Sequence, residues 1–266
     1  LAITTAVMLS GCVYFRGPYI HFYKTTARKA AVSESETGVI LLAHGSGEKW
    51  NAAVAGAFAK TGGAYKKELV FGMGSARDIQ KSIDRLEALG VRAIVVAPLF
   101  LSSHSEMYRH LEYILGVREE PDVLFMLLMG RHDAASDSAH GGHGSPNTML
   151  ERVRFRVPYR VASSVNYNPI ITEILLDRLQ GIMPGSSVFL LSHGPITAED
   201  DTKWLHDLSQ YGTALSQKFP QSRFFGMTFR DDAPQINRDR AIQKIQDAVR
   251  RETAAGQHVI VVPFLL

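Results

Sequence analysis

Residues 38–46 read GVILLAHGS, and residues 187–195 read SVFLLSHGP. Each is an apolar run of the length of a buried strand, and each ends at a histidine followed by glycine. Near-continuous apolar strands are typical of parallel sheets whose two faces are both covered by helices. Both stretches therefore predict a buried strand that carries a histidine, His44 or His193, to its carboxyl end.

Strand and helix patterns alternate after the first of these stretches. The segment 75–90 has an Ile/Leu stripe at helical spacing, and Ser75 is suited to cap its first turn. Alternating strands and helices imply parallel βαβ units. The pattern predicts helices at 48–60 and 75–90, and strands at 69–74, 93–101 and 123–130.

The same order returns after the second stretch. It predicts helices at 202–219 and 237–256 and strands at 222–229 and 258–266. We therefore expect an α/β fold of two lobes, each a small parallel β-sheet flanked by helices, related by internal duplication. The expected boundaries are an N-terminal lobe at 38–130, a His/Gly/Ser-rich linker at 131–160, and a C-terminal lobe at 161–266 that is truncated at its end.

The composition is that of a globular protein. The chain has 266 residues, of which 45% are hydrophobic and 21% charged, and this argues against wholesale disorder. The net charge is only +3 and no dense Lys/Arg block occurs, so nucleic acid is not an expected partner. The single cysteine, Cys12, excludes an internal disulfide.

The setting of Cys12 indicates export. The chain opens LAITTAVMLSGC, and residues 9–12 match the lipobox of bacterial lipoprotein signal peptides. The apolar run is too short to span a bilayer as a permanent helix. We expect residues 1–11 to be a signal-peptide remnant, Cys12 to carry a lipid anchor and 12–37 to be a tether. The protein would then be a periplasmic, membrane-anchored lipoprotein, and it would be cytoplasmic if the match is a chance one.

Residues suited to metal chemistry follow two of the predicted strands. Ligands bind at the carboxyl ends of parallel strands, where His44 lies. The loop after 93–101 brings His104, Glu106 and His110 to the same edge if the two strands are neighbours. Two imidazoles with a carboxylate suit a borderline divalent metal or proton transfer near neutral pH. Each histidine alone is equally compatible with a structural role.

These motifs resemble one enzyme family. AHGS after the first strand, the Ile-striped helix leading into GVRAIVVAPLFL, and the histidine loop behind it resemble the class II tetrapyrrole chelatases. The most similar members are the sirohydrochlorin cobalto- and ferrochelatases of the CbiX/SirB type, and 162–179 and 229–242 resemble their two-lobed long form. The resemblance implies two chelatase-like lobes that insert Co²⁺ or Fe²⁺, a substrate here, into a tetrapyrrole such as sirohydrochlorin without nucleotide.

The resemblance also implies site residues. The family's first histidine falls on His44. Its second follows the pattern PLFL-x-x-G-x-H, in which Glu106 occupies the histidine position of this chain and His104 the glycine position. Either residue can take that place. We favour His104 as metal ligand with His44, and Glu106 as an assisting ligand or proton acceptor.

Other polar residues are candidates for holding the ring. A tetrapyrrole loses two pyrrole protons when it binds metal, and its carboxylates call for cations or donors. The candidates are Ser46, Arg109, Arg131, Arg230 and His193. Because Pro195 removes an N–H from its turn, His193 is either a relic of the duplication or lines the cleft. Residues 230–234 are expected to form a turn that leads into the last helix, where Asp231 and Asp232 either are functional or, as we favour, cap the helix.

Two rival functions remain open. An exported protein that binds metal or haem on a chelatase scaffold, without catalysis, fits the lipobox. A histidine phosphatase fits less well, because Ala43 and Ser192 stand where such enzymes have arginine. The linker either binds metal weakly or is a solvated connection; its candidate ligands are His132, His140, His143, Asp133 and Asp137.

Overall fold

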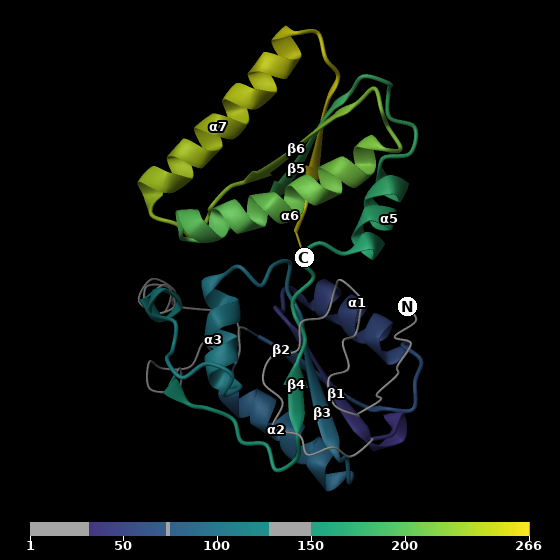
Figure 1. Ribbon diagram of the computed structural model, residues 1–266, viewed down its shortest axis with the longest axis vertical. Coiled ribbons are helices and arrows are strands. Elements are labelled where there is room, and N and C mark those ends of the chain that lie inside the picture. The colour runs from purple at the N-terminus through teal and green to yellow at the C-terminus, as the bar shows by residue number, and fades with distance from the viewer. Residues whose placement is uncertain (1–31, 73–74, 128–149, 266) are drawn as a thin grey trace, which may run out of the picture. The chain divides into compact units, whose positions relative to one another are not determined.

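The chain forms two α/β lobes, as expected from the repeated pattern (Figure 1). The structure, a computed structural model, describes residues 32–72, 75–127 and 150–265. The first lobe takes the described residues up to Phe100 together with Met107–Ser164. The second lobe takes Leu101–Glu106 and the described residues from Val165 onward.

A parallel sheet with the strand order β2-β1-β3-β4 organises the first lobe. The strand β1 therefore lies between two neighbours, and one of them is β3, as the predicted site requires. After a 3-10 turn at Glu34–Glu36, the elements are β1 (Thr37–Ala43), α1 (Glu48–Ala59), β2 (Lys66–Phe71), α2 (Ala76–Ala88), β3 (Ala93–Leu99), α3 (Glu106–Ile114) and β4 (Tyr159–Val161).

The helix α2 covers one face of this sheet. Ile79, Ile83 and Leu86 are fully buried, and they pack with alternate residues of β1 and β3 in one core. Burying such a side chain stabilises the fold by about 1.5–3 kcal/mol. Ser75 caps α2 as predicted, since its hydroxyl oxygen accepts a hydrogen bond from the amide N–H of Asp78 at 3.3 Å.

The predicted strand at 123–130 is wrong. Residues 123–127 are helical, and Phe125 is buried with its ring stacked on His110 at 4.5 Å between centroids. A short apolar run suits a helix as well as a strand, and in this helix only Phe125 is buried, whereas Val123, Leu124 and Leu127 are exposed. The fourth strand is instead β4, inside the predicted linker, so that the first lobe extends to Ser164.

The second lobe repeats the arrangement around β5. Its sheet has the order β6-β5-β7, with β5 in the middle as β1 is in the first lobe. This matches the duplication inferred from the two histidine stretches. The elements are α5 (Pro169–Arg178), β5 (Ser187–Ser192), α6 (Ala198–Ser216), β6 (Arg223–Thr228), α7 (Gln235–Ala254) and β7 (Val259–Pro263).

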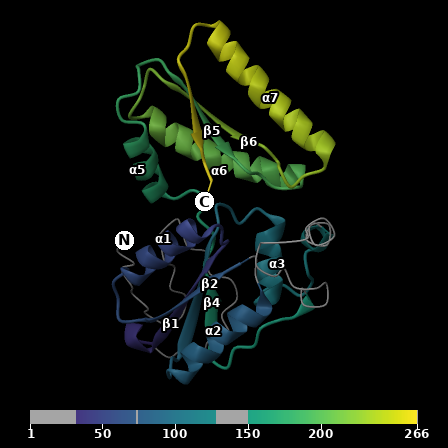
Figure 2. The same ribbon diagram turned by 180° about the vertical axis from the view of Figure 1, so that it is seen from behind.

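Helices cover both faces of this second sheet. Val188 and Leu190 pack toward α5 and α6, whereas Phe189 and Leu191 pack toward Ile245 of α7. Figures 1 and 2 show α6 and α7 on opposite sides of β5 and β6. All six residues of β5 are consequently buried.

None of the helices in the described ranges is long and apolar enough to cross a membrane.

Candidate functional site

His44 follows β1 directly, at the carboxyl end of the first sheet, and its side chain is exposed. The chain turns there at Gly45, whose φ of +80° is a left-handed conformation that favours glycine. His44 Nδ1 lies 2.7 Å from the carbonyl oxygen of Gly45. Because a carbonyl only accepts hydrogen bonds, Nδ1 carries the proton and Nε2 of the neutral ring keeps its lone pair. That nitrogen can bind a metal ion or take a proton.

Ser46 stabilises the same turn. Its backbone N–H donates to Asn51 Oδ1 at 2.9 Å, and Asn51 lies in the first turn of α1. An amide engaged in this way is not available to hold an anion. The exposed Ser46 hydroxyl is the group left to contact a ligand.

His193 occupies the equivalent place after β5. Gly194 has a φ of +81°, nearly that of Gly45. In the first lobe the amide of Gly72 donates to Ala43 at 3.1 Å, and in the second the amide of Phe229 donates to Ser192 at 2.9 Å. The two histidine turns therefore share a backbone conformation and a hydrogen bond from the neighbouring strand's end.

The partner of the imidazole differs between the two turns. His193 Nδ1 lies 2.5 Å from Asp231 Oδ2. This hydrogen bond raises the pKa of His193, burial opposes the rise, and the charges of Asp231 and Asp232 add to it. A carboxylate that fixes Nδ1–H and makes Nε2 more basic is a common companion of metal-binding histidines.

Asp231 was expected to cap the last helix, and this prediction is wrong. The helix α7 begins at Gln235 with Pro234 at the N-cap position and no side-chain cap. The carboxylate of Asp231 is instead bonded to His193. The tight turn at residues 230–233, closed by the amide of Ala233 donating to Arg230 at 2.9 Å, brings Asp231 there.

His104 belongs to the second lobe by its contacts, whereas His44 belongs to the first. His104 Nε2 lies 3.7 Å from Asp207 Oδ2 on α6. Burial raises the pKa of Asp207, and nearby His104 and His206 partly offset this. A proton gained by His104 would be stabilised by Asp207. Asp207 was not predicted from the sequence. Its place between the apolar residues Trp204 and Leu208, both buried on α6, could have indicated a partly buried acid.

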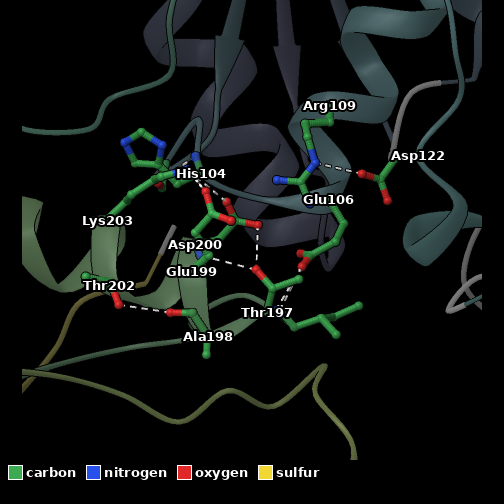
Figure 3. Close-up of polar contacts among 12 residues, drawn as sticks. His104, Glu106, Arg109, Asp122, Thr197, Ala198, Glu199, Asp200, Thr202 and Lys203 are labelled. Carbon is green, nitrogen blue, oxygen red and sulfur yellow. Dashed lines mark hydrogen bonds and ion pairs between the residues drawn. The ribbon is translucent and has the colours of Figure 1, made fainter.

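Glu106 is buried and bonded to the backbone before α6. Its Oε1 accepts the amides of Ile196 at 2.9 Å and Thr197 at 3.3 Å (Figure 3). Thr197 in turn caps α6 by accepting the amide of Asp200 at 3.1 Å. A carboxylate at this place complements the N-terminal end of the helix dipole. Glu106 thus positions the loop that leads into α6.

Two further candidates have structural partners within the first lobe. Arg109 Nε donates to Asp122 Oδ2 at 2.7 Å, as Figure 3 shows. His110 is 1% exposed and stacks on Phe125, so it lies in the core rather than at the edge of the sheet. In the second lobe, Arg230 donates to the carbonyl oxygens of Pro195 and Ile196.

Several predicted residues lie outside the described ranges. They are Cys12, Arg131, His132, Asp133, Asp137, His140 and His143. Among the described residues, no group of three or more His, Cys, Asp or Glu side chains is arranged to hold a metal ion.

Comparison with known families gives a match over residues 38–181, which is more than half of the chain, to the CbiX family. The chain belongs to the CbiX family. This places it among the class II tetrapyrrole chelatases, as the histidine motifs indicated. The match begins at the residue where the first strand motif begins, covers the first lobe and ends after α5.

One solved structure confirms the fold. SirB from Bacillus subtilis with Fe³⁺ superposes with a TM-score of 0.53 at 15% sequence identity, over 86% of this chain and 77% of that one. The sirohydrochlorin chelatase SirB from Bacillus subtilis subspecies spizizenii in complex with cobalt gives a TM-score of 0.45 at 14% identity, over 85% and 86%. No curated protein matches the sequence significantly.

Proposed function

We propose that this protein inserts a divalent metal ion, Co²⁺ or Fe²⁺, into a tetrapyrrole such as sirohydrochlorin without nucleotide. The observation that carries the proposal is His44, an exposed imidazole at the strand end of a CbiX-family lobe with Nδ1 bonded to a main-chain carbonyl. The SirB structures, which contain Fe³⁺ in one case and cobalt in the other, support metal as the substrate.

Metal insertion requires two protons to leave the ring. Each pyrrole N–H must lose its proton before the nitrogen can bind the metal, so a base near the ring speeds the reaction. His44 Nε2 can accept such a proton or hold the incoming ion, and a neutral imidazole releases the ion more readily than thiolates would. In this proposal His44 is the first metal ligand.

His104 is proposed as the second ligand or base. Its neighbour Asp207 stabilises the imidazolium formed when His104 takes a proton, because the two side chains are 3.7 Å apart. Glu106, foreseen as an assisting ligand, has one oxygen bonded to two backbone amides. We therefore assign it the positioning of the loop before α6.

Three residues are proposed to contact the ring's carboxylates. Ser46 offers an exposed hydroxyl, and His193 an imidazole whose raised pKa favours the cation. Arg109 offers a guanidinium whose Nε is bonded to Asp122. Hydrogen bonds to a charged group contribute about 1.5–3 kcal/mol each, so a few of them suffice to orient the ring.

The direct test is the initial rate of Co²⁺ and Fe²⁺ insertion into sirohydrochlorin, followed by absorbance. General acid–base groups typically contribute 10²–10⁴-fold, so His44→Ala should lower the rate by about 10²-fold or more. His258→Ala is the matched control, since His258 precedes β7 at the opposite end of its sheet. Tight stoichiometric binding of metal or haem without any acceleration would favour the binding-protein alternative.

We also propose that the protein is anchored outside the cytoplasm through Cys12, on the basis of the sequence Leu9-Ser10-Gly11-Cys12. A multiply acylated cysteine binds membranes firmly, because each buried CH₂ contributes about 0.8 kcal/mol. In cells, Cys12→Ala should move the protein from the membrane fraction to the soluble fraction. An unchanged distribution would reject the anchor and leave the cytoplasmic alternative.

A further inference from the structure

A cavity of about 360 Å³ lies wholly within the second lobe. Its walls are the first turns of α6, the end of β6 with Arg230 behind it, and one face of α7. The strand β6 is an outer strand of its sheet. No described histidine lines the cavity, so it includes neither of the two proposed metal ligands. Its volume falls in the range of small-molecule sites.

The charged groups around this cavity are predominantly positive. Arg230, Arg240 and Lys244 contribute three cations, and Asp201 is the one acid among the lining residues. The carboxylate of Asp201 already accepts the hydroxyl of Thr228 at 2.6 Å. A concave surface with excess positive charge attracts anions.

The two cations of α7 that line the cavity have no protein partner in the described ranges. Arg240 and Lys244 make no hydrogen bond or ion pair there, and neither does the side-chain amide of Asn237. The three residues follow one another at helical spacings of three and four, so they share one face. Elsewhere on the helix, Arg238 bonds to Asp231 and Gln235, and Arg250 pairs with Asp247.

Two like charges at this spacing destabilise an isolated helix unless a negative group lies between them. Among the described residues the one acid lining the cavity is Asp201, which pairs with neither Arg240 nor Lys244, and a bound anion would supply the missing negative group. Arg230 adds a third cation from the opposite wall. Its backbone has a φ of +53°, which is uncommon for a residue with a side chain, and its guanidinium is held by the carbonyls of Pro195 and Ile196. Arg230 is therefore fixed in place.

The same three elements also give the cavity an apolar surface. Ala198, Leu205, Met227 and Ala241 line it. A bare inorganic anion would leave this surface uncovered, whereas a carbon skeleton would bury it.

From these observations we propose that the cavity binds an organic anion with two or more carboxylate or phosphate groups. The anionic groups contact Arg230, Arg240 and Lys244, Asn237 donates from its amide, and the carbon skeleton covers the apolar surface. The proposal does not depend on the chelatase reaction, and its test needs neither metal nor tetrapyrrole.

Isothermal titration of the whole protein tests the site with three probes. Citrate represents carboxylates, 3-phosphoglycerate represents phosphate esters, and inorganic phosphate lacks the carbon skeleton. At low salt we expect one citrate or one 3-phosphoglycerate to bind per chain, with an affinity that falls as salt is added. The tighter of the two identifies the anionic group that the site prefers.

Substitutions then locate the site. Arg240→Gln and Lys244→Gln change exposed side chains and should each weaken the better probe about tenfold, the effect of losing one charge-assisted hydrogen bond. Arg250→Gln, on the same helix but outside the cavity, should leave binding unchanged. The proposal is overturned if neither organic probe binds, if phosphate binds as tightly, or if Arg250→Gln weakens binding as much.

Discussion

The two histidine turns differ in what each Nδ1–H contacts. His44 Nδ1–H donates a hydrogen bond to a neutral main-chain carbonyl, whereas His193 Nδ1–H donates one to the carboxylate of Asp231. The backbones are otherwise alike, with φ values of +80° at Gly45 and +81° at Gly194. Duplication has thus kept the geometry that presents the imidazole and changed its electrostatic setting. The hydrogen bond to Asp231 raises the pKa of His193 and so favours its protonated form, which does not bind metal.

The largest expected effect separates the two histidines in the reaction. His44→Ala should lower the initial rate of cobalt insertion by about 10²-fold or more, and His193→Ala by less than about tenfold, because only the first removes a proposed ligand. Circular dichroism of both variants checks that they remain folded. Equal losses would show that His193 contributes to the reaction as much as His44 does.

A second prediction concerns the glycine that forms each turn. At either position the left-handed backbone conformation is about 1–2 kcal/mol less favourable for alanine than for glycine. At Gly194 its Cβ would also lie 2.5 Å from Thr228 Cβ, whereas at Gly45 the nearest atom would be Gly72 N at 3.4 Å. Gly194→Ala should therefore lower the free energy of unfolding by about 3 kcal/mol and Gly45→Ala by about 1–2 kcal/mol, measured in urea.

Gly56→Ala provides the control for this pair. Gly56 lies inside α1 and has open space around the position of a Cβ. Because alanine has the higher helix propensity, Gly56→Ala should raise the free energy of unfolding by about 0.5–1 kcal/mol. If Gly45→Ala and Gly194→Ala were equally destabilising, Thr228 would have moved aside and the second turn would be no tighter than the first.

The smallest expected effect is the pH-dependent contribution of the His193–Asp231 pair to the stability of the fold. The pKa of His193 in the folded protein is raised above 6.5, so its ion pair with Asp231 stabilises the fold below that pH. The stabilisation is lost as the pH rises through the raised pKa. Asp231→Asn should lower stability by less than about 1 kcal/mol at pH about 6, since the pair is half exposed, and scarcely change it at pH about 9.

Thermal unfolding across this pH range measures the change, and NMR titration of the His193 ring should show its pKa falling in Asp231→Asn. Asp239→Asn, on the exposed side of α7 and bonded to Gln235, is the control and should leave the ring's pKa unchanged. A pH-independent loss in Asp231→Asn would mean that the hydrogen bond, not the charge, provides the stability.

The repeated strand motif was enough to predict both lobes, because a buried parallel strand has an unmistakable apolar run. Local signals also placed the cap Ser75 and the stripe of α2. They failed at 123–127, where a short run carries no helical or strand period, and at β4, whose three residues have no apolar run at all. The position of β4 depends on pairing with β3, which its own sequence does not encode.

The candidate site was predictable only in part for the same reason. His44 and His193 follow from their strands, but their acceptors do not. Asp231 lies 38 residues from His193 in sequence and meets it through the end of β6. Glu106 likewise bonds to amides 90 and 91 residues away. Long-range contacts of this kind decide whether a polar residue performs chemistry or supports the fold.

The assignment of residues 101–106 to the second lobe gives the chain three crossings between its lobes, after Phe100, Glu106 and Ser164. A single cut therefore cannot release two complete halves. A fragment ending at Ser164 would carry a buried Glu106 without the two amides it accepts, and the remaining half would lack the carboxylate in front of α6. The lobes are therefore not interchangeable copies: the second depends on a stretch of chain, 101–106, that a cut after Ser164 would leave with the first.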